Sequence, residues 1–274
     1  MAIFIGVAVF CLANFQIVFA QNQDWLDVSE TQLKILRNEH NSYENQKSDI
    51  LFLIDTSGSL SGSDFSEEKK FVANLLNEIS VGNEATRVEV IPFGKTASIF
   101  IDQISNPSLT KNKCTFNEKF NPMAQSINGW LTNMKDAFQL AKEVCYGIYS
   151  GEKRGTLNTL KTTVILLTDG VWNYPYSSPS PVTIAEELLT AGVDVFAIGV
   201  GNIDYDNLKQ VVENPDQQAF HLADFDQFAE LATYIRGGKM IFFQNCVSLN
   251  QSTEQKFKKG INLGDFFIKK LQYT

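Results

Sequence analysis

The stretch that decides the fold is residues 49–59, which read DILFLIDTSGS. Residues 50–54 are apolar without alternation, and this pattern indicates a strand buried on both faces of a parallel sheet. Where the strand ends, the chain places a carboxylate and two hydroxyls close together, on Asp55, Ser57 and Ser59. Ligands of open α/β sheets bind outside the carboxyl ends of the strands, so these side chains lie where a site is expected.

Other strand-like segments place this strand within a larger sheet. Residues 163–167 and 193–200 are apolar runs of the same kind. Residues 87–93 and 97–101 alternate more clearly, and around Lys95 they are expected to form a hairpin at one edge of the sheet.

Amphipathic segments between and after these strands predict helices. Asp64, Asp204 and Asp224 precede three of them and are expected to be N-caps. Strands that alternate with helices predict an α/β fold: a doubly wound, mostly parallel central sheet with one antiparallel edge strand and helices on both faces. The helical segments are 65–79, 134–148, 184–189, 206–212 and 225–235.

A second carboxylate follows the strand at 163–167, where the chain continues Thr168-Asp169-Gly170. Asp169 is therefore expected at the same edge of the sheet as Asp55. Two converging acids repel each other unless a cation lies between them. Oxygen donors, several of them neutral hydroxyls, suit a hard divalent ion. The residues predict a site for Mg²⁺, with Mn²⁺ or Ca²⁺ as alternatives.

This combination resembles the metal-ion-dependent adhesion site of the von Willebrand factor A family. The resemblance covers roughly residues 48–237 and implies that family's Rossmann-like fold, in which two acids and three hydroxyls hold the metal. Within the family the chain is most similar to polydom-like, matrilin-like and collagen-VI-like A domains. The residues that match the metal-holding positions are Asp55, Ser57, Ser59, Thr132 and Asp169.

The surroundings of the threonine depart from the family's pattern. The family commonly has small residues before this position, whereas Trp130 and Leu131 precede Thr132 here. One interpretation is that these bulky side chains flank the site and shape its ligand face. The other is that Trp130 fills the neighbouring loop.

The sequence argues against an enzyme. Phosphoryl-transfer enzymes of the haloacid dehalogenase type have Asp-x-Asp, and here Ser57 occupies the second position. A serine hydrolase needs Gly-x-Ser-x-Gly, but residues 58–62 have Leu60 in the middle. The only histidines are His40 and His221. We expect His40 in the leader and His221 on an edge strand, where neither acts as a general base.

The composition and the N-terminus indicate a secreted protein. The first segment has no charged residue and carries an apolar run, which is typical of a signal peptide and too short and interrupted for a membrane anchor. The net charge of −8 repels nucleic acid and anionic lipid, so neither nucleic-acid binding nor membrane insertion is expected. The predicted parts are a signal peptide at 1–20, a polar leader at 21–47 that lies against the domain or is partly disordered, the A domain at 48–237 and a C-terminal tail at 238–274.

Three cysteines remain after removal of the signal peptide, in an oxidising compartment. We expect a disulfide between Cys114 and Cys145, which flank the segment through Thr132. Cys246 then either stays free or pairs with a partner outside this chain. Asn250-Gln251-Ser252 is an N-glycosylation sequon, so Asn250 is an expected glycosylation site.

The resemblance implies an extracellular adhesion or matrix protein. Its cation keeps one coordination position open, which a glutamate or aspartate of an extracellular protein ligand fills. Two alternatives stay open: a metal-independent structural assembly module of the extracellular matrix, and a non-catalytic regulatory part of a larger mosaic protein, such as a protease or a channel subunit.

Overall fold

A computed structural model of the chain describes residues 30–43, 47–77, 79–104, 106, 112–125, 131–147, 160–170 and 179–235. By its internal contacts the chain divides into Met1–Lys239 and Met240–Thr274, and every described residue belongs to the first unit. The predicted signal peptide, the C-terminal tail, Trp130, Cys246 and Asn250 lie outside the described residues.

A six-stranded sheet forms the centre of the described part, in the order β3-β2-β1-β4-β5-β6. All neighbours are parallel except β3, which runs antiparallel to β2 at one edge. This arrangement confirms the predicted doubly wound sheet and the antiparallel edge strand. The strands are β1 (Ser48–Asp55), β2 (Thr86–Phe93), β3 (Ile101–Asp102), β4 (Lys161–Thr168), β5 (Asp194–Val200) and β6 (Ala219–Leu222).

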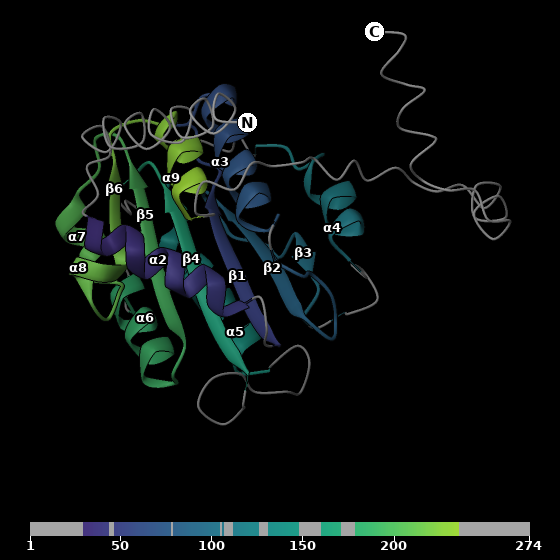
Figure 1. Cartoon of the computed structure of the whole chain (residues 1–274). Helices are drawn as coiled ribbons and strands as arrows, with labels where there is room; N and C mark the ends of the chain where they lie inside the picture. The colour runs from purple at the N-terminus through teal and green to yellow at the C-terminus, as the bar shows by residue number, and fades with distance from the viewer. Residues whose placement is uncertain are drawn as a thin grey trace, which may run out of the picture. The chain divides into compact units, whose positions relative to one another are not determined.

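Helices cover both faces of the sheet (Figure 1). One apolar core lies between the sheet and α2, α3, α4 and α9, and a second lies between the sheet and α5, α6 and α7. The described helices are α2 (Glu30–Ser42), α3 (Gly62–Leu75), α4 (Lys113–Phe120), α5 (Met134–Cys145), α6 (Pro181–Thr190), α7 (Tyr205–Lys209), α8 (Pro215–Gln218) and α9 (Gln227–Ile235).

The burial of β1 explains its uninterrupted apolar sequence. Every residue of the strand is buried. Phe52 and Ile54 belong to the core under α3 and α9, whereas Leu51 and Leu53 belong to the core under α5 and α6. A strand with helices on both faces has no polar face, so its side chains do not alternate.

Helix α2 is part of the packed domain, although its residues lie in the segment expected to be a polar leader. It crosses one face of the sheet (Figure 1), and Leu36 is buried in the core there. Glu39 forms an ion pair with Lys161 on β4 at 2.5 Å between Oε2 and Nζ. The Tyr43 hydroxyl donates to Oγ1 of Thr163 at 2.7 Å. Residues 30–42 of the expected leader thus form a helix that contacts the sheet.

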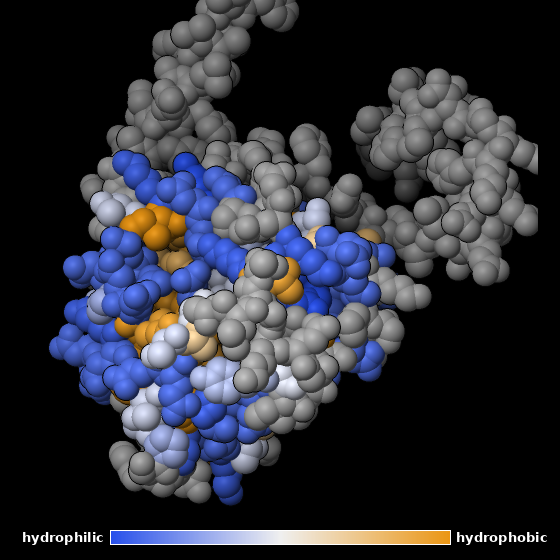
Figure 2. Space-filling model, turned by 90° about the horizontal axis from the view of Figure 1, so that it is seen from below, coloured by the Kyte–Doolittle hydropathy of each residue, from blue (hydrophilic) through white to orange (hydrophobic). Residues whose placement is uncertain are grey.

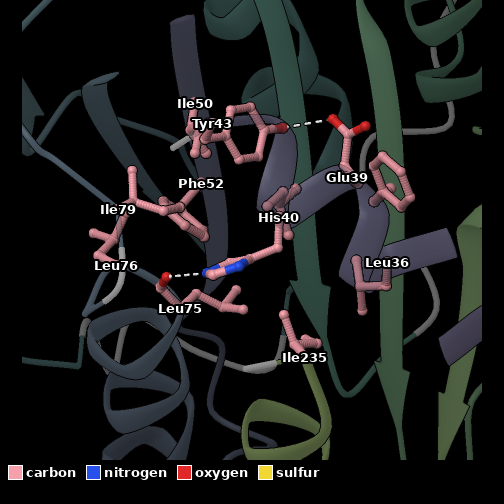
Figure 3. Close-up of a pocket in the computed structure, with 12 residues that line it drawn as sticks. Leu36, Glu39, His40, Tyr43, Ile50, Phe52, Leu75, Leu76, Ile79 and Ile235 are labelled. Carbon is pink, nitrogen blue, oxygen red and sulfur yellow. Dashed lines mark hydrogen bonds between the residues drawn. The ribbon is translucent and has the colours of Figure 1, made fainter. Parts of the chain in front are cut away.

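A small, mainly apolar pocket lies between α2, α3, α9 and the sheet (Figure 3). His40 on α2 reaches across it, and its Nε2 bonds the carbonyl oxygen of Leu75 at the end of α3 at 2.9 Å. Ile235, the last residue of α9, lines the same pocket. Helix α2 therefore lies against both α3 and α9 on this face of the sheet.

The helix starts agree only partly with the expected caps. Asp204 caps α7 as predicted, accepting from the backbone N–H of Asn207. Asp64 is not the N-cap of α3, because Ser61 holds that position and exchanges hydrogen bonds with Asp64, the third residue of the helix. This is a capping box, and the sequence around residue 61 carries its spacing.

Helix α4 was not predicted from the sequence. It is only eight residues long and has a weakly amphipathic pattern. Its start is fixed by Asn112, which accepts from the backbone N–H of Thr115, and its buried side chains are Phe116 and Phe120. These two rings stack at 5.2 Å between centroids and complete the core at the α3 side.

The predicted disulfide between Cys114 and Cys145 is wrong. Cys145 is a buried thiol on α5, whereas Cys114 on α4 is disulfide-bonded. Cys145 belongs to the core under α5, on the other face of the sheet from α4. Flanking the same segment in sequence therefore did not bring the two cysteines together.

The described surface is mainly hydrophilic. Seen from below, the coloured residues are mostly hydrophilic, with separate apolar patches (Figure 2). Among the described residues, Phe100 is the large apolar side chain with substantial exposure, at 43%. Within the same residues, the helices are too short or too polar to cross a membrane.

Candidate metal centre

Asp55 ends β1 and is held from two sides. The backbone N–H of Ser57 donates to its Oδ1 at 2.8 Å, and the hydroxyl of Thr168 donates to its Oδ2 at 2.7 Å. The side chain is fully buried. Because β1 and β4 are adjacent and parallel, their carboxyl ends bring Asp55 and Thr168 together. Asp55 is thus fixed in orientation by backbone and side chain alike.

A chain of hydrogen bonds joins the remaining residues of the motif loop to the second acid. The hydroxyls of Ser57 and Ser59 lie 2.8 Å apart, and the hydroxyl of Ser59 donates to Oδ1 of Asp169 at 2.9 Å. Ser57 is buried, while Ser59 is exposed. The site therefore extends from the buried side chain of Ser57 to the solvent-exposed side chain of Ser59.

Thr132 lies against the same edge. Its side chain is buried, and a β-carbon placed on Gly170 would come within 3.4 Å of its hydroxyl oxygen. The next residue, Asn133, holds the loop to the β2 hairpin, since its backbone N–H donates to the carbonyl of Gly94 at 2.7 Å. All five predicted site residues thus meet at the carboxyl edge of the sheet.

Two supporting residues had no role in the sequence analysis. Thr168 was expected only as the residue that ends the second strand, yet its hydroxyl orients Asp55. Gln125 lies far from the motif in sequence, and its side-chain amide donates to the carbonyls of Ser57 and Leu60 at 3.0 and 2.9 Å. The position of Thr168, one residue before the predicted acid, could have suggested its role, whereas Gln125 carries no such signal.

Burial and mutual repulsion shape the charge of the site. Burial, followed by the charge of Asp169, raises the pKa of Asp55 from 3.8 to about 6. Burial also raises the pKa of Asp169, although the hydrogen bond from Ser59 opposes the shift. Both carboxylates are thus costly to ionise in the protein alone, and a nearby positive charge would offset that cost.

The donor set fits a hard divalent cation. It combines two carboxylates with three hydroxyls, all oxygen donors of the kind that Mg²⁺ prefers. Within the described residues, no group of three or more acidic, histidine or cysteine side chains is arranged to hold a metal. A site of this kind would therefore depend on the hydroxyls of Ser57, Ser59 and Thr132 as well as on its two acids.

Comparison with known proteins agrees with this fold and motif. The family model for the von Willebrand factor type A domain matches residues 49–233. The chain belongs to this family. The match begins at the second residue of β1 and includes all five site residues.

Curated relatives of this A domain are large extracellular proteins. Mouse Matrilin-2 is 26% identical over 193 residues, covering 70% of this chain and 19% of the relative. The mouse protein named Sushi, von Willebrand factor type A, EGF and pentraxin domain-containing protein 1 is 29% identical over 187 residues, covering 67% of this chain and 5% of the relative. Human Collagen alpha-5(VI) chain is 27% identical over 224 residues, covering 79% of this chain and 8% of the relative.

The chain thus spans a small part of these relatives, and what it shares with them is the A domain. The similarity of this chain to matrilins and collagen VI places the protein outside the cell. The predicted secretion and the predicted similarity to matrix A domains are both confirmed.

Solved structures share the fold. Proximal thread matrix protein 1 from the mussel byssus superposes with a TM-score of 0.57 at 22% identity, covering 69% of this chain and 45% of the other. A further structure of that protein, with a zinc-occupied adhesion motif, gives a TM-score of 0.58 over 69% of this chain and 44% of the other, also at 22% identity. A divalent metal is thus seen at this motif in a protein of the same fold.

Proposed function

We propose that this chain is a secreted adhesion or matrix protein that binds an acidic group of an extracellular protein ligand through a divalent cation. The observation that carries the proposal is the hydrogen-bonded chain from Ser57 through Ser59 to Asp169, next to the doubly held Asp55. Together with Thr132, which lies beside Gly170, these residues bring five oxygen-bearing side chains to one edge of the sheet.

The residues of the site have separate tasks in this proposal. The hydroxyls of Ser57, Ser59 and Thr132 would contact the cation, and Asp55 and Asp169 would hold it directly or through water. Mg²⁺ is the expected ion, with Mn²⁺ or Ca²⁺ as alternatives. Neutral hydroxyl ligands leave the cation electrophilic, so a glutamate or aspartate of the ligand can contribute strongly to binding. Ser59, the exposed member of the set, marks the side from which the ligand would approach.

We also propose that the protein is not an enzyme. His221 bonds the carbonyl oxygen of Gly201 at 2.7 Å, and His40 bonds that of Leu75, so both histidines interact with the backbone away from the site. The acids of the site accept hydrogen bonds from the hydroxyls of Ser59 and Thr168, and neither histidine is placed to act as a general base there. Binding, rather than metal-assisted hydrolysis, is the chemistry that this set of residues favours.

The test is affinity capture of extracellular proteins by the secreted chain, in Mg²⁺ and in EDTA. We expect specific partners in Mg²⁺ that are absent in EDTA and absent with Ser59→Ala, a variant that removes one hydroxyl at an exposed position. Capture of the same partners at the same level in EDTA would instead favour the metal-independent assembly module.

A further inference from the structure

Glu68 is a charged residue in an apolar position of α3. Its neighbours on the buried face of the helix are Phe65, Phe71, Val72 and Leu75, all part of the core. Glu68 is as buried as they are, with an exposed fraction of 0%. A buried carboxyl without compensation is among the costliest groups in a protein interior, so its presence here asks for a physical reason.

Hydrogen bonding within the described part of the chain does not supply that reason. Neither carboxyl oxygen of Glu68 has a hydrogen-bond partner there. The two lysines that follow it point to other groups: Lys69 donates to the carbonyls of Asn121 and Met123, and Lys70 pairs with Glu67 at 2.6 Å. A buried polar group left in this way calls for a specific explanation.

The charges that act on Glu68 come from the candidate metal centre. After burial, the acids that raise the pKa of Glu68 are, in order, Asp55, Asp169 and Asp64. The first two are the acids of the site, and Asp64 lies in the first turn of α3 beside the motif loop. Glu68 follows Asp64 by one helical turn and so lies on the same face of α3, and a cation at the site would attract its carboxylate.

We propose that Glu68 is a third acid of the metal centre. It does not contact the cation, and its negative charge strengthens cation binding through electrostatic attraction. The inference rests on the proposed function and adds a residue outside the motif. Glu68 is not assigned as a ligand, because the described residues hold no cluster of three acids arranged around one ion. A divalent cation held by Asp55 and Asp169 would offset their negative field at Glu68 and so favour the charged form of its carboxyl group.

The experiment compares Mg²⁺ and Mn²⁺ binding by titration calorimetry in the full secreted chain. Glu68→Gln keeps the shape and removes the charge, and Glu68→Leu restores the apolar character of the helix face. Glu67→Gln, which makes the same chemical change one residue earlier at a half-buried position paired with Lys70, is the matched control. We expect both Glu68 variants to bind the metal about 10-fold more weakly, because the attraction between the Glu68 carboxylate and the cation is lost, and Glu67→Gln to bind as the wild type does.

Melting in EDTA separates this role from a merely structural one. We expect Glu68→Leu to melt at a higher temperature than the wild type in EDTA and to gain less on addition of Mg²⁺. Unchanged metal affinity in both Glu68 variants, with a wild type that binds Mg²⁺, would overturn this inference alone. A wild type that binds neither ion would overturn the proposed function and this inference together.

Discussion

Asp55 accepts two hydrogen bonds in a place where it has no contact with solvent. These bonds favour its charged form, yet burial and the charge of Asp169 outweigh them. The residue is therefore held in a fixed orientation at an energetic cost. Such a cost is typical of a site whose geometry serves binding rather than stability.

This cost predicts how stability depends on pH when metal is removed. The pKa of Asp55 is raised to about 6 in the folded protein, so its favourable contribution is complete below about pH 4 and is lost as the pH rises through about 6. The loss is about 3 kcal/mol at neutral pH. Urea unfolding in EDTA should therefore give a lower free energy of unfolding at pH 7.5 than at pH 5.

Asp55→Asn provides the comparison, because it keeps the shape and cannot ionise. Its free energy of unfolding should fall less over this pH range, although not to zero, since the pKa of Asp169 is shifted in the same direction. Equal pH dependence in the variant and the wild type would show that Asp55 carries no such cost.

The site residues that could be predicted from the sequence are those that directly follow a strand. Asp55 and Asp169 follow buried strands directly, so their meeting could be inferred from the sheet alone. Gln125 and Glu68 could not be inferred in this way. Gln125 reaches the motif loop through a tertiary contact, and Glu68 lies within a helix whose pattern gives no reason to expect a carboxyl there.

Helix α2 has a mainly polar sequence, yet it packs against the core of the domain. Its exposed face is polar, but Leu33 and Leu36 are buried against the core. At its two ends, Gln32 donates to the carbonyl of Ala219 on β6, and Glu39 pairs with Lys161 on β4. The helix closes the face of the sheet that α3 and α9 leave uncovered (Figure 1).

If α2 is an integral part of the domain, a cavity made in it should destabilise the whole domain. Leu36→Ala is expected to lower the free energy of unfolding by about 2–5 kcal/mol, the usual range for a buried leucine. Asn38→Ala, at an exposed position of the same helix, should change it by less than about 0.5 kcal/mol. Urea denaturation followed by circular dichroism measures both. A similar small effect of both substitutions would mean that α2 is a dispensable leader.

The long, strongly patterned elements could be predicted and the short ones could not. β1, β4, β5 and α5 have clear sequence patterns and lie where these patterns indicated. Helix α4 is anchored by Phe116 and Phe120 in the core, and strand β3 is held by its pairing with β2. Propensity alone does not define elements of this length, because tertiary packing decides whether they form.

For the whole molecule, the cysteines give a test that does not involve metal. We expect Cys145 to react with an alkylating reagent without prior reduction, and only after unfolding, because it is a buried thiol. Cys114 should react only after reduction. Non-reducing peptide mapping would identify its partner, and we expect Cys246, because Cys11 lies in the predicted signal peptide. A peptide joining Cys114 to Cys145 would contradict the arrangement of the two helices.

The central claim is that the carboxyl edge of the sheet holds a divalent cation, and Asp55→Ala tests it most directly. The measurement is the melting temperature of wild type and variant, in EDTA and in Mg²⁺. We predict that Mg²⁺ raises the melting temperature of the wild type, as any ligand specific to the folded state does. Asp55→Ala should fold, with an unchanged circular dichroism spectrum and a melting temperature in EDTA at or above that of the wild type, but show no rise with Mg²⁺. An equal rise in the variant, or none in the wild type, would contradict the claim.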